Sequence, residues 1–251
     1  MRLPLVLFVA FVTPALADDI SMSGHIDGAM AARLHTVLTD GKSHTLRVKS
    51  SGGDDLPALA LAYDIRRAHA AIVVDGLCAG PCASDLFVAA SERRVMPGGL
   101  VIFGATAASR LAMVPPNRSI EVSPSYAEAA RQETQLATEA RANPALLLEP
   151  QLELQTQCYS LTSHNPAGRA YINYQSQFVG WTPSRIYLAH AGVKVSGFWP
   201  TSEAQFQAAL KSDFPGGARG AIAFSGSDSP LAQQALLARL KSVKECDTGL
   251  K

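Results

Sequence analysis

The stretch that decides the fold runs from Val48 to Gly104 and reads VKSSGGDDLPALALAYDIRRAHAAIVVDGLCAGPCASDLFVAASERRVMPGGLVIFG. Residues 44–50 predict a strand that leads into it, and the apolar run 71–76 predicts a buried strand. A helix lies between them, with one buried stripe predicted at Leu56, Leu59, Ala60 and Tyr63. A short helix and two short strands follow residue 82. Alternating strands and helices of this kind predict an α/β fold with right-handed parallel crossovers.

The sequence on either side predicts further elements. Residues 19–26 indicate a first strand, and residues 27–39 a helix that closes at Gly41. Residues 124–157 are predicted to be helical with a break at Asn143-Pro144, and a last helix is predicted over 230–244. Tyr171, Tyr174, Phe178 and Trp181 have helical spacing, which favours a core stripe over a ligand-binding box.

The first residues read MRLPLVLFVAFVTPALADD and are typical of a secretory signal peptide. Arg2 precedes a short apolar stretch, and Ala15-Leu16-Ala17 forms a small-residue cleavage site. We therefore expect residues 1–17 to be removed and residues 18–251 to form one exported domain, periplasmic or secreted. No later segment has the roughly 18 uninterrupted apolar residues of a membrane span, so no membrane anchor is predicted.

The charge of the chain excludes some classes of partner. Loss of Arg2 with the signal peptide leaves 21 basic residues against 21 acidic ones. This balance gives no electrostatic footprint for nucleic acid. No GxGxxG, Walker, HExxH or EF-hand motif is present, so neither a cofactor nor a metal is predicted.

Four cysteines in an exported chain are expected to be oxidised. Separation along the chain favours Cys78–Cys82 and Cys158–Cys246 among the three possible pairings. A thioredoxin-type pair has two residues between its cysteines, whereas CAGPC has three. Zinc is disfavoured because no second Cys/His pair lies nearby at ligand spacing. A disulfide that pins the turn is the favoured interpretation of residues 78–85.

The order of the glycine loop, helix, buried strand and serine turn in residues 48–104 resembles the core of the Clp protease proteolytic subunit and its crotonase-like relatives. A weaker similarity continues in WTPSRIYLAHAGVKVSG. The sequence looks most like exported bacterial members with paired cysteines around the serine turn. The resemblance implies a repeated β-β-α spiral with a helical insert at about 110–157 and a C-terminal extension at about 211–251 that carries the last helix. It also implies that the insert corresponds to the protruding handle used for subunit contacts, so a homo-oligomer is one possibility and a helical cover over the sheet is the other.

The same resemblance implies a nucleophile at Ser84 and an oxyanion hole formed by the backbone N–H groups of Gly53 and Asp85. A helix N-terminus suits a developing oxyanion, because its free N–H groups and dipole favour negative charge. The base of the family falls on Gly104, however, and its acid falls close to Gly180. Without a base, a serine hydroxyl remains a poor nucleophile.

Two functions therefore stay open. The first is a non-catalytic binding or assembly module that binds an unknown protein or peptide in the cleft at the former oxyanion site. The second is a serine hydrolase or peptidase that uses Ser84 with a relocated base, for which His164 and His190 are the candidates. Reaction of Ser84 with a fluorophosphonate distinguishes the two.

Overall fold

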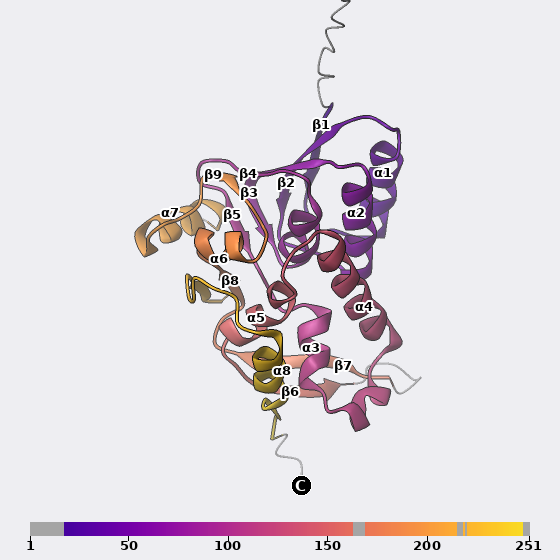
Figure 1. The fold of residues 1–251 in the computed structure, drawn as a ribbon, viewed down its shortest axis with the longest axis vertical. Helices are drawn as coiled ribbons and strands as arrows, with labels where there is room; N and C mark the ends of the chain where they lie inside the picture. Colours follow the sequence, from indigo (N-terminus) through magenta and orange to yellow (C-terminus); the bar gives the residue numbers. More distant parts are fainter. Residues whose placement is uncertain (1–17, 163–168, 215–217, 219, 248–251) are drawn as a thin grey trace, which may run out of the picture.

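A computed structural model describes residues 18–162, 169–214, 218 and 220–247 of the chain (Figure 1). The predicted signal peptide and His164 lie outside these residues. Within them the chain is a mixed α/β protein with a parallel sheet, as the sequence predicts. No helix among the described residues is both long enough and apolar enough to cross a membrane.

The main sheet has the strand order β1-β2-β3-β4-β9, and all its pairings are parallel. Its strands are β1 (Asp18–Ser23), β2 (His44–Ser50), β3 (Ala71–Ala79), β4 (Arg93–Val95) and β9 (Ser196–Gly197). The first half of β3 pairs with β4, and its second half pairs with β5 (Leu100–Ile102). This sixth strand therefore continues the sheet at the end where β3 enters the serine turn.

The helices of the first half cover this sheet. Helix α1 (Gly28–Leu38) packs against α2 (Asp55–Arg67), and α2 packs against the π-helical turn η1 (Cys82–Phe87). In α2 the buried apolar side chains are Ala58, Leu59, Leu61, Ala62 and Ile65. The predicted stripe is therefore wrong at Leu56 and Ala60, which are exposed, because three neighbouring elements enclose a different and wider arc of the helix.

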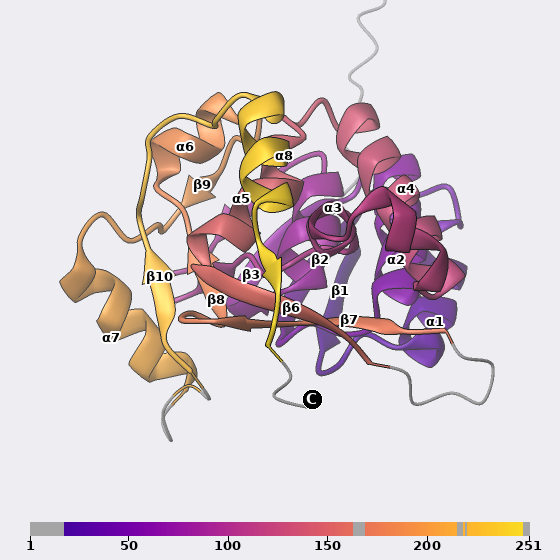
Figure 2. The same ribbon diagram turned by 90° about the horizontal axis from the view of Figure 1, so that it is seen from below.

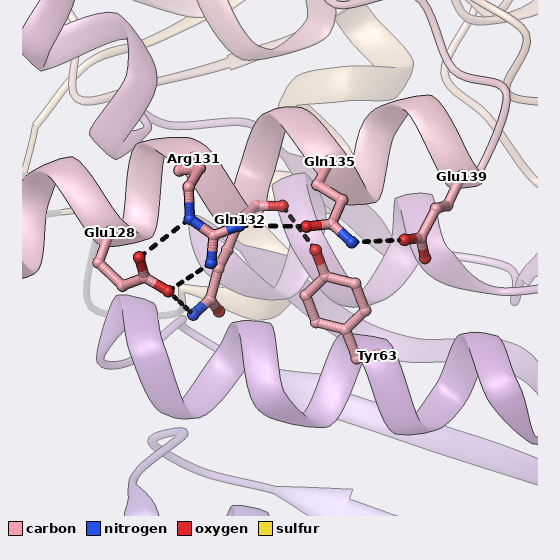
Figure 3. A network of polar contacts seen from close by, with 6 residues as sticks. All are labelled: Tyr63, Glu128, Arg131, Gln132, Gln135 and Glu139. Carbon is pink, nitrogen blue, oxygen red and sulfur yellow. Dashed lines mark hydrogen bonds and ion pairs between the residues drawn. The ribbon is translucent and has the colours of Figure 1, made fainter.

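Most of the predicted insert is helical. It contains α3 (Ala107–Met113), the 3-10 turn η2 (Pro116–Glu121), α4 (Pro124–Glu139) and α5 (Ala145–Glu153). Helix α4 lies alongside α2, and the Tyr63 hydroxyl on α2 donates to the carbonyl of Gln132 at 3.0 Å (Figure 3). The exposed side chains of α4 bond mainly to one another, since Arg131 binds both carboxylate oxygens of Glu128 (Figure 3).

The remaining elements lie in the second half of the chain. They are β6 (Thr156–Thr162), β7 (Tyr171–Ser176), β8 (Gly180–Thr182), α6 (Arg185–His190), α7 (Glu203–Asp213), β10 (Ile222–Phe224), α8 (Gln233–Lys241) and β11 (Lys244–Glu245). Strands β6 and β7 form an antiparallel pair, and β11 adds to β6 in parallel. Figure 2 shows this small sheet beside α3, α5 and α8.

The segment 171–181 corrects a second expectation. Its aromatic side chains have helical spacing, but the backbone forms β7 and β8. Trp181 is fully buried, whereas Tyr171 is 43% exposed. The segment therefore contributes one aromatic residue to the core and another to the surface.

Candidate functional site

The serine turn is built at the end of the central strand. Strand β3 ends at Ala79, Gly80 has a φ of +55°, and residues 82–87 wind into a π-helical turn. A disulfide joins Cys78 in the strand to Cys82 at the start of the turn. Both cysteines are fully buried, so the bond fastens the turn to the sheet from inside. Cys158 and Cys246 form the second disulfide, and both predicted pairings are confirmed.

Ser84 lies inside this turn and is 6% exposed. Its hydroxyl donates a hydrogen bond to the carbonyl of Gly80 at 3.2 Å, and its backbone N–H bonds to the same carbonyl at 2.9 Å. The acceptor of this hydroxyl is a carbonyl oxygen, which does not act as a general base.

The glycine loop packs directly onto the turn. A Cβ atom on Gly52, which has a φ of +105°, would lie 3.0 Å from the carbonyl oxygen of Ala79. A Cβ on Gly53 would lie only 2.1 Å from the carbonyl oxygen of Ile26, so the backbone itself requires glycine there. The oxyanion role of the Gly53 and Asp85 amides stays a prediction.

The structure also brings the predicted base position next to the turn. A Cβ on Gly104 would lie 3.6 Å from the Cα of Gly80, which is an ordinary contact distance. A Cβ on Gly180 would lie 2.4 Å from the Cγ2 atom of Ile102. The base position therefore has room for a side chain, whereas the acid position does not.

Four of the five described histidines interact with other groups, and the fifth, His69, is exposed. Three of them approach aspartates: His25 approaches Asp54, His35 approaches Asp64 and His44 approaches Asp40. Nδ1 of His190 donates to the carbonyl of Asp228 at 2.8 Å, because a carbonyl can only accept. Nδ1 therefore carries a proton and cannot take one from Ser229, whose hydroxyl lies 3.2 Å away. No histidine within the described ranges contacts Ser84.

A cluster of acidic side chains lies behind the serine turn. Asp85 is 1% exposed, and neither of its carboxylate oxygens has a hydrogen-bond partner among the described residues. Glu133 on α4 is also buried and accepts hydrogen bonds from the backbone N–H groups of Ala107 and Ala108 at 2.9 and 2.7 Å. These two carboxyls come from segments almost 50 residues apart in the chain.

Their environment changes the protonation of both groups. Burial raises the pKa of Asp85 well above its usual range, and repulsion from Glu133 and Asp55 raises it further. Burial likewise raises the pKa of Glu133 to about 7, against the two backbone hydrogen bonds that lower it. Burial and repulsion thus favour the neutral form of Asp85.

A cavity of about 390 Å³ lies beside the glycine loop. Its walls come from the start of α2, from α3, from α4 and from β7. The residues are Gly53, Asp54, Asp55, Leu56, Pro57, Arg110, Ser125, Tyr126, Ala129 and Tyr171. Burial raises the pKa of Asp55, and the nearby Arg110 opposes that rise. The cavity combines both signs of charge with an apolar and aromatic wall.

Sequence reasoning did not predict the charged residues around the turn and the cavity. Asp55, Arg110 and Glu133 belong to no motif and are brought together only by the packing of α2, α3 and α4. One signal was available for Glu133, since it lies in the apolar stripe of α4 with Ala129, Ala130, Leu136 and Ala137. A carboxylate in such a stripe is unusual unless it has a partner. No three metal-binding side chains cluster in the part of the chain that the structure describes.

Comparison with known proteins finds similar solved structures but no matching family. No protein-family model matches the chain, and no curated protein matches it. Among solved structures, the chain is similar to a mutant of ClpP1 from Listeria monocytogenes. The identity is 17%, the TM-score is 0.36, and the match covers 49% of this chain and 71% of that one. The match is thus a distant one that covers half of the chain.

Proposed function

We propose that this chain is a non-catalytic binding module of Clp-protease-like ancestry that holds a peptide or an extended protein segment in the cavity beside the glycine loop. The observation that carries the proposal is the state of Ser84. Its hydroxyl is buried and donates to the Gly80 carbonyl, and the predicted base position, which packs against Gly80, is glycine. A serine without a base retains only the small rate enhancement that binding and oxyanion donors supply.

The local charge supports the same conclusion. The carboxyl groups of Asp85 and Glu133 are buried behind the turn, and burial raises the pKa of both. An oxyanion hole works through donors and positive potential aimed at the developing charge. These two carboxyl groups supply no positive charge beside Ser84.

The cavity supports a binding role. Its volume lies within the range of small-molecule and peptide pockets, and its polar groups are few and distinct. Leu56 and Tyr171 line this cavity and are 37% and 43% exposed, which offers apolar contact to a ligand. The two disulfides support a location in an oxidising compartment, periplasmic or secreted.

A fluorophosphonate probe tests the absence of catalysis. The purified chain is incubated with the probe beside an active serine hydrolase, and labelling is measured by intact-protein mass. We expect no labelling of the wild-type chain and no difference from Ser84→Ala. Stoichiometric labelling that disappears in Ser84→Ala would show that a base reaches Ser84 and would establish the hydrolase function instead.

Thermal unfolding in the presence of a tryptic digest of casein tests the binding role. We expect the digest to raise the melting temperature of the wild-type chain and to have a smaller effect on Tyr171→Ala, which removes one cavity wall. Ile186→Ala is the control, because Ile186 is also a large exposed side chain but lies outside the cavity. No shift for the wild-type chain, or an equal loss in both variants, would contradict peptide binding in this cavity.

A further inference from the structure

Two opposite charges face the same cavity without pairing. Asp55, in the first turn of α2, and Arg110, on α3, both line it. Each alters the pKa of the other in the direction expected for opposite charges. Yet Arg110 forms no ion pair with any carboxylate among the described residues. Both charges are therefore presented to the same cavity.

Hydrogen bonds hold the Arg110 guanidinium in place without using all of its N–H donors. One terminal nitrogen donates to the Ala105 carbonyl at 2.9 Å, and the other donates to the Tyr126 hydroxyl at 3.2 Å. The guanidinium also lies 5.8 and 6.0 Å from the ring centres of Tyr126 and Tyr174. A guanidinium carries five N–H donors. Its neighbours therefore fix the plane of the group while leaving N–H groups for a ligand carboxylate, which guanidinium binds well.

The acidic side of the cavity lies at the N-terminal end of α2. Asp54 precedes the helix, makes no capping hydrogen bond through its side chain, and also lines the cavity. Asp55 follows it, with its carboxyl more buried. Carboxylates in this position are the natural partners of a ligand ammonium group.

The wall between the charged ends is apolar and aromatic. Leu56 and Pro57 come from α2, Ala129 comes from α4, and Tyr126 and Tyr171 pack edge to face with ring centres 6.1 Å apart. A cavity of about 390 Å³ has space for two or three amino-acid residues.

We propose that this cavity binds short zwitterionic peptides of about dipeptide size, with the terminal carboxylate on Arg110, the terminal ammonium on Asp55 and the apolar side chains on the wall formed by Leu56 and Tyr171. The inference rests on the proposed peptide-binding function and narrows it to peptides with two free ends. Both ends of the ligand are recognised, so a cap at either end removes a charge-assisted hydrogen bond.

Isothermal titration calorimetry with four ligands tests the inference at pH 7. The ligands are the dipeptide Leu-Leu, N-acetyl-Leu-Leu, Leu-Leu-amide and free leucine. We expect each cap to weaken binding by roughly tenfold or more, because a charge-assisted hydrogen bond is lost. We expect free leucine to bind more weakly than Leu-Leu, since it cannot cover the apolar wall. Equal binding of capped and uncapped dipeptides, or tighter binding of leucine, would overturn the inference.

Two variants assign the ends. In Asp55→Asn, N-acetyl-Leu-Leu is expected to bind almost as well as Leu-Leu, whereas Leu-Leu-amide still binds more weakly. In Arg110→Gln, Leu-Leu-amide is expected to bind almost as well as Leu-Leu, whereas N-acetyl-Leu-Leu binds more weakly. Asp75→Asn makes the same change on an exposed aspartate outside the cavity and should behave as the wild-type chain does. If Arg110→Gln does not fold, the titrations of the wild-type chain with capped ligands and the titrations of Asp55→Asn still test the inference. If casein peptides bind but Leu-Leu does not, the narrower inference fails and the peptide-binding function stands.

Discussion

Replacement of Glu133 by glutamine should change how the stability of the protein depends on pH. The side chain is 2% exposed and faces Asp85 from η1, Asp55 from α2 and Arg110 from α3. Burial raises its pKa from 4.5 to about 7. The folded protein therefore holds this proton at pH values where the unfolded chain has released it. The free energy of unfolding then falls as the pH rises from about 4.5 to about 7, and this contribution is level above that.

The size of the effect follows from the two pKa values. The difference between about 7 and 4.5 corresponds to a loss of about 3 kcal/mol at pH 8 relative to pH 4. Glutamine is neutral at every pH and keeps one oxygen for the amides of α3, so Glu133→Gln should lack this loss. We expect the variant to match the wild-type chain within about 1 kcal/mol at pH 4.5 and to be more stable by up to about 3 kcal/mol at pH 8.

Urea denaturation followed by the fluorescence of the buried Trp181 and Trp199 measures both curves. Asp85 adds its own fall in stability with rising pH, and this fall is smaller in Glu133→Gln because repulsion from Glu133 no longer raises the pKa of Asp85. Both effects make the variant more stable than the wild-type chain at high pH. Glu139→Gln is the matched control, because Glu139 lies on the same helix in an exposed position. The reasoning is refuted if Glu133→Gln shifts stability by the same amount at pH 4.5 and pH 8.

Four further changes test other parts of the structure. Loss of the Cys158–Cys246 bond in a double serine variant should cost about 2–5 kcal/mol of unfolding free energy in urea, because the bond closes a long loop; a smaller loss would mean that the ends are held without it. Gly53→Ala should lower the free energy of unfolding by about 2–3 kcal/mol or more, because the new Cβ would collide with the backbone of Ile26. Gly28→Ala should leave the free energy of unfolding unchanged or raise it, because a Cβ there meets open space. Equal effects of the two substitutions would contradict this packing. Gly104→His should raise the fluorophosphonate labelling of Ser84 measurably above the wild-type level, and an unchanged rate would show that Ser84 is misdirected as well as unassisted. We also expect a homo-oligomer to associate through the outer face of α4. Arg131→Glu, on α4, should then lower the mass measured by sedimentation velocity, whereas Arg33→Glu, on α1, should not. An unchanged sedimentation profile for both variants would exclude the outer face of α4 as the interface.

The strands of the main sheet could be predicted from sequence because each is a local pattern. Residues 44–50 form β2 within the predicted limits, and the apolar run 71–76 lies within β3. The predicted helix 27–39 became α1, from Gly28 to Leu38, since Asp27 caps it with its side chain. Both disulfides were predictable because export and separation along the chain limit the pairings.

The failures came from tertiary packing. The spacing of Leu56 and Ala60 is helical, but which face of α2 is buried depends on η1, α1 and α4 together. The aromatic spacing of residues 171–181 coincides with a helical period, although the chain there forms strands. The position of Ser84 and the glycines could be predicted, whereas the acidic side chains around them could not. Asp55, Asp85 and Glu133 approach one another only through long-range packing, which no local pattern encodes.

The second disulfide has a consequence for any cut in the chain. Cys246 follows β11, which pairs with β6 beside Cys158, so the last described residues are bonded to the middle of the sequence. A single peptide-bond cleavage between these two cysteines would leave both fragments covalently joined. The intact mass would increase by one water, and the fragments would separate only after reduction. A nicked molecule would therefore pass unnoticed on a non-reducing gel.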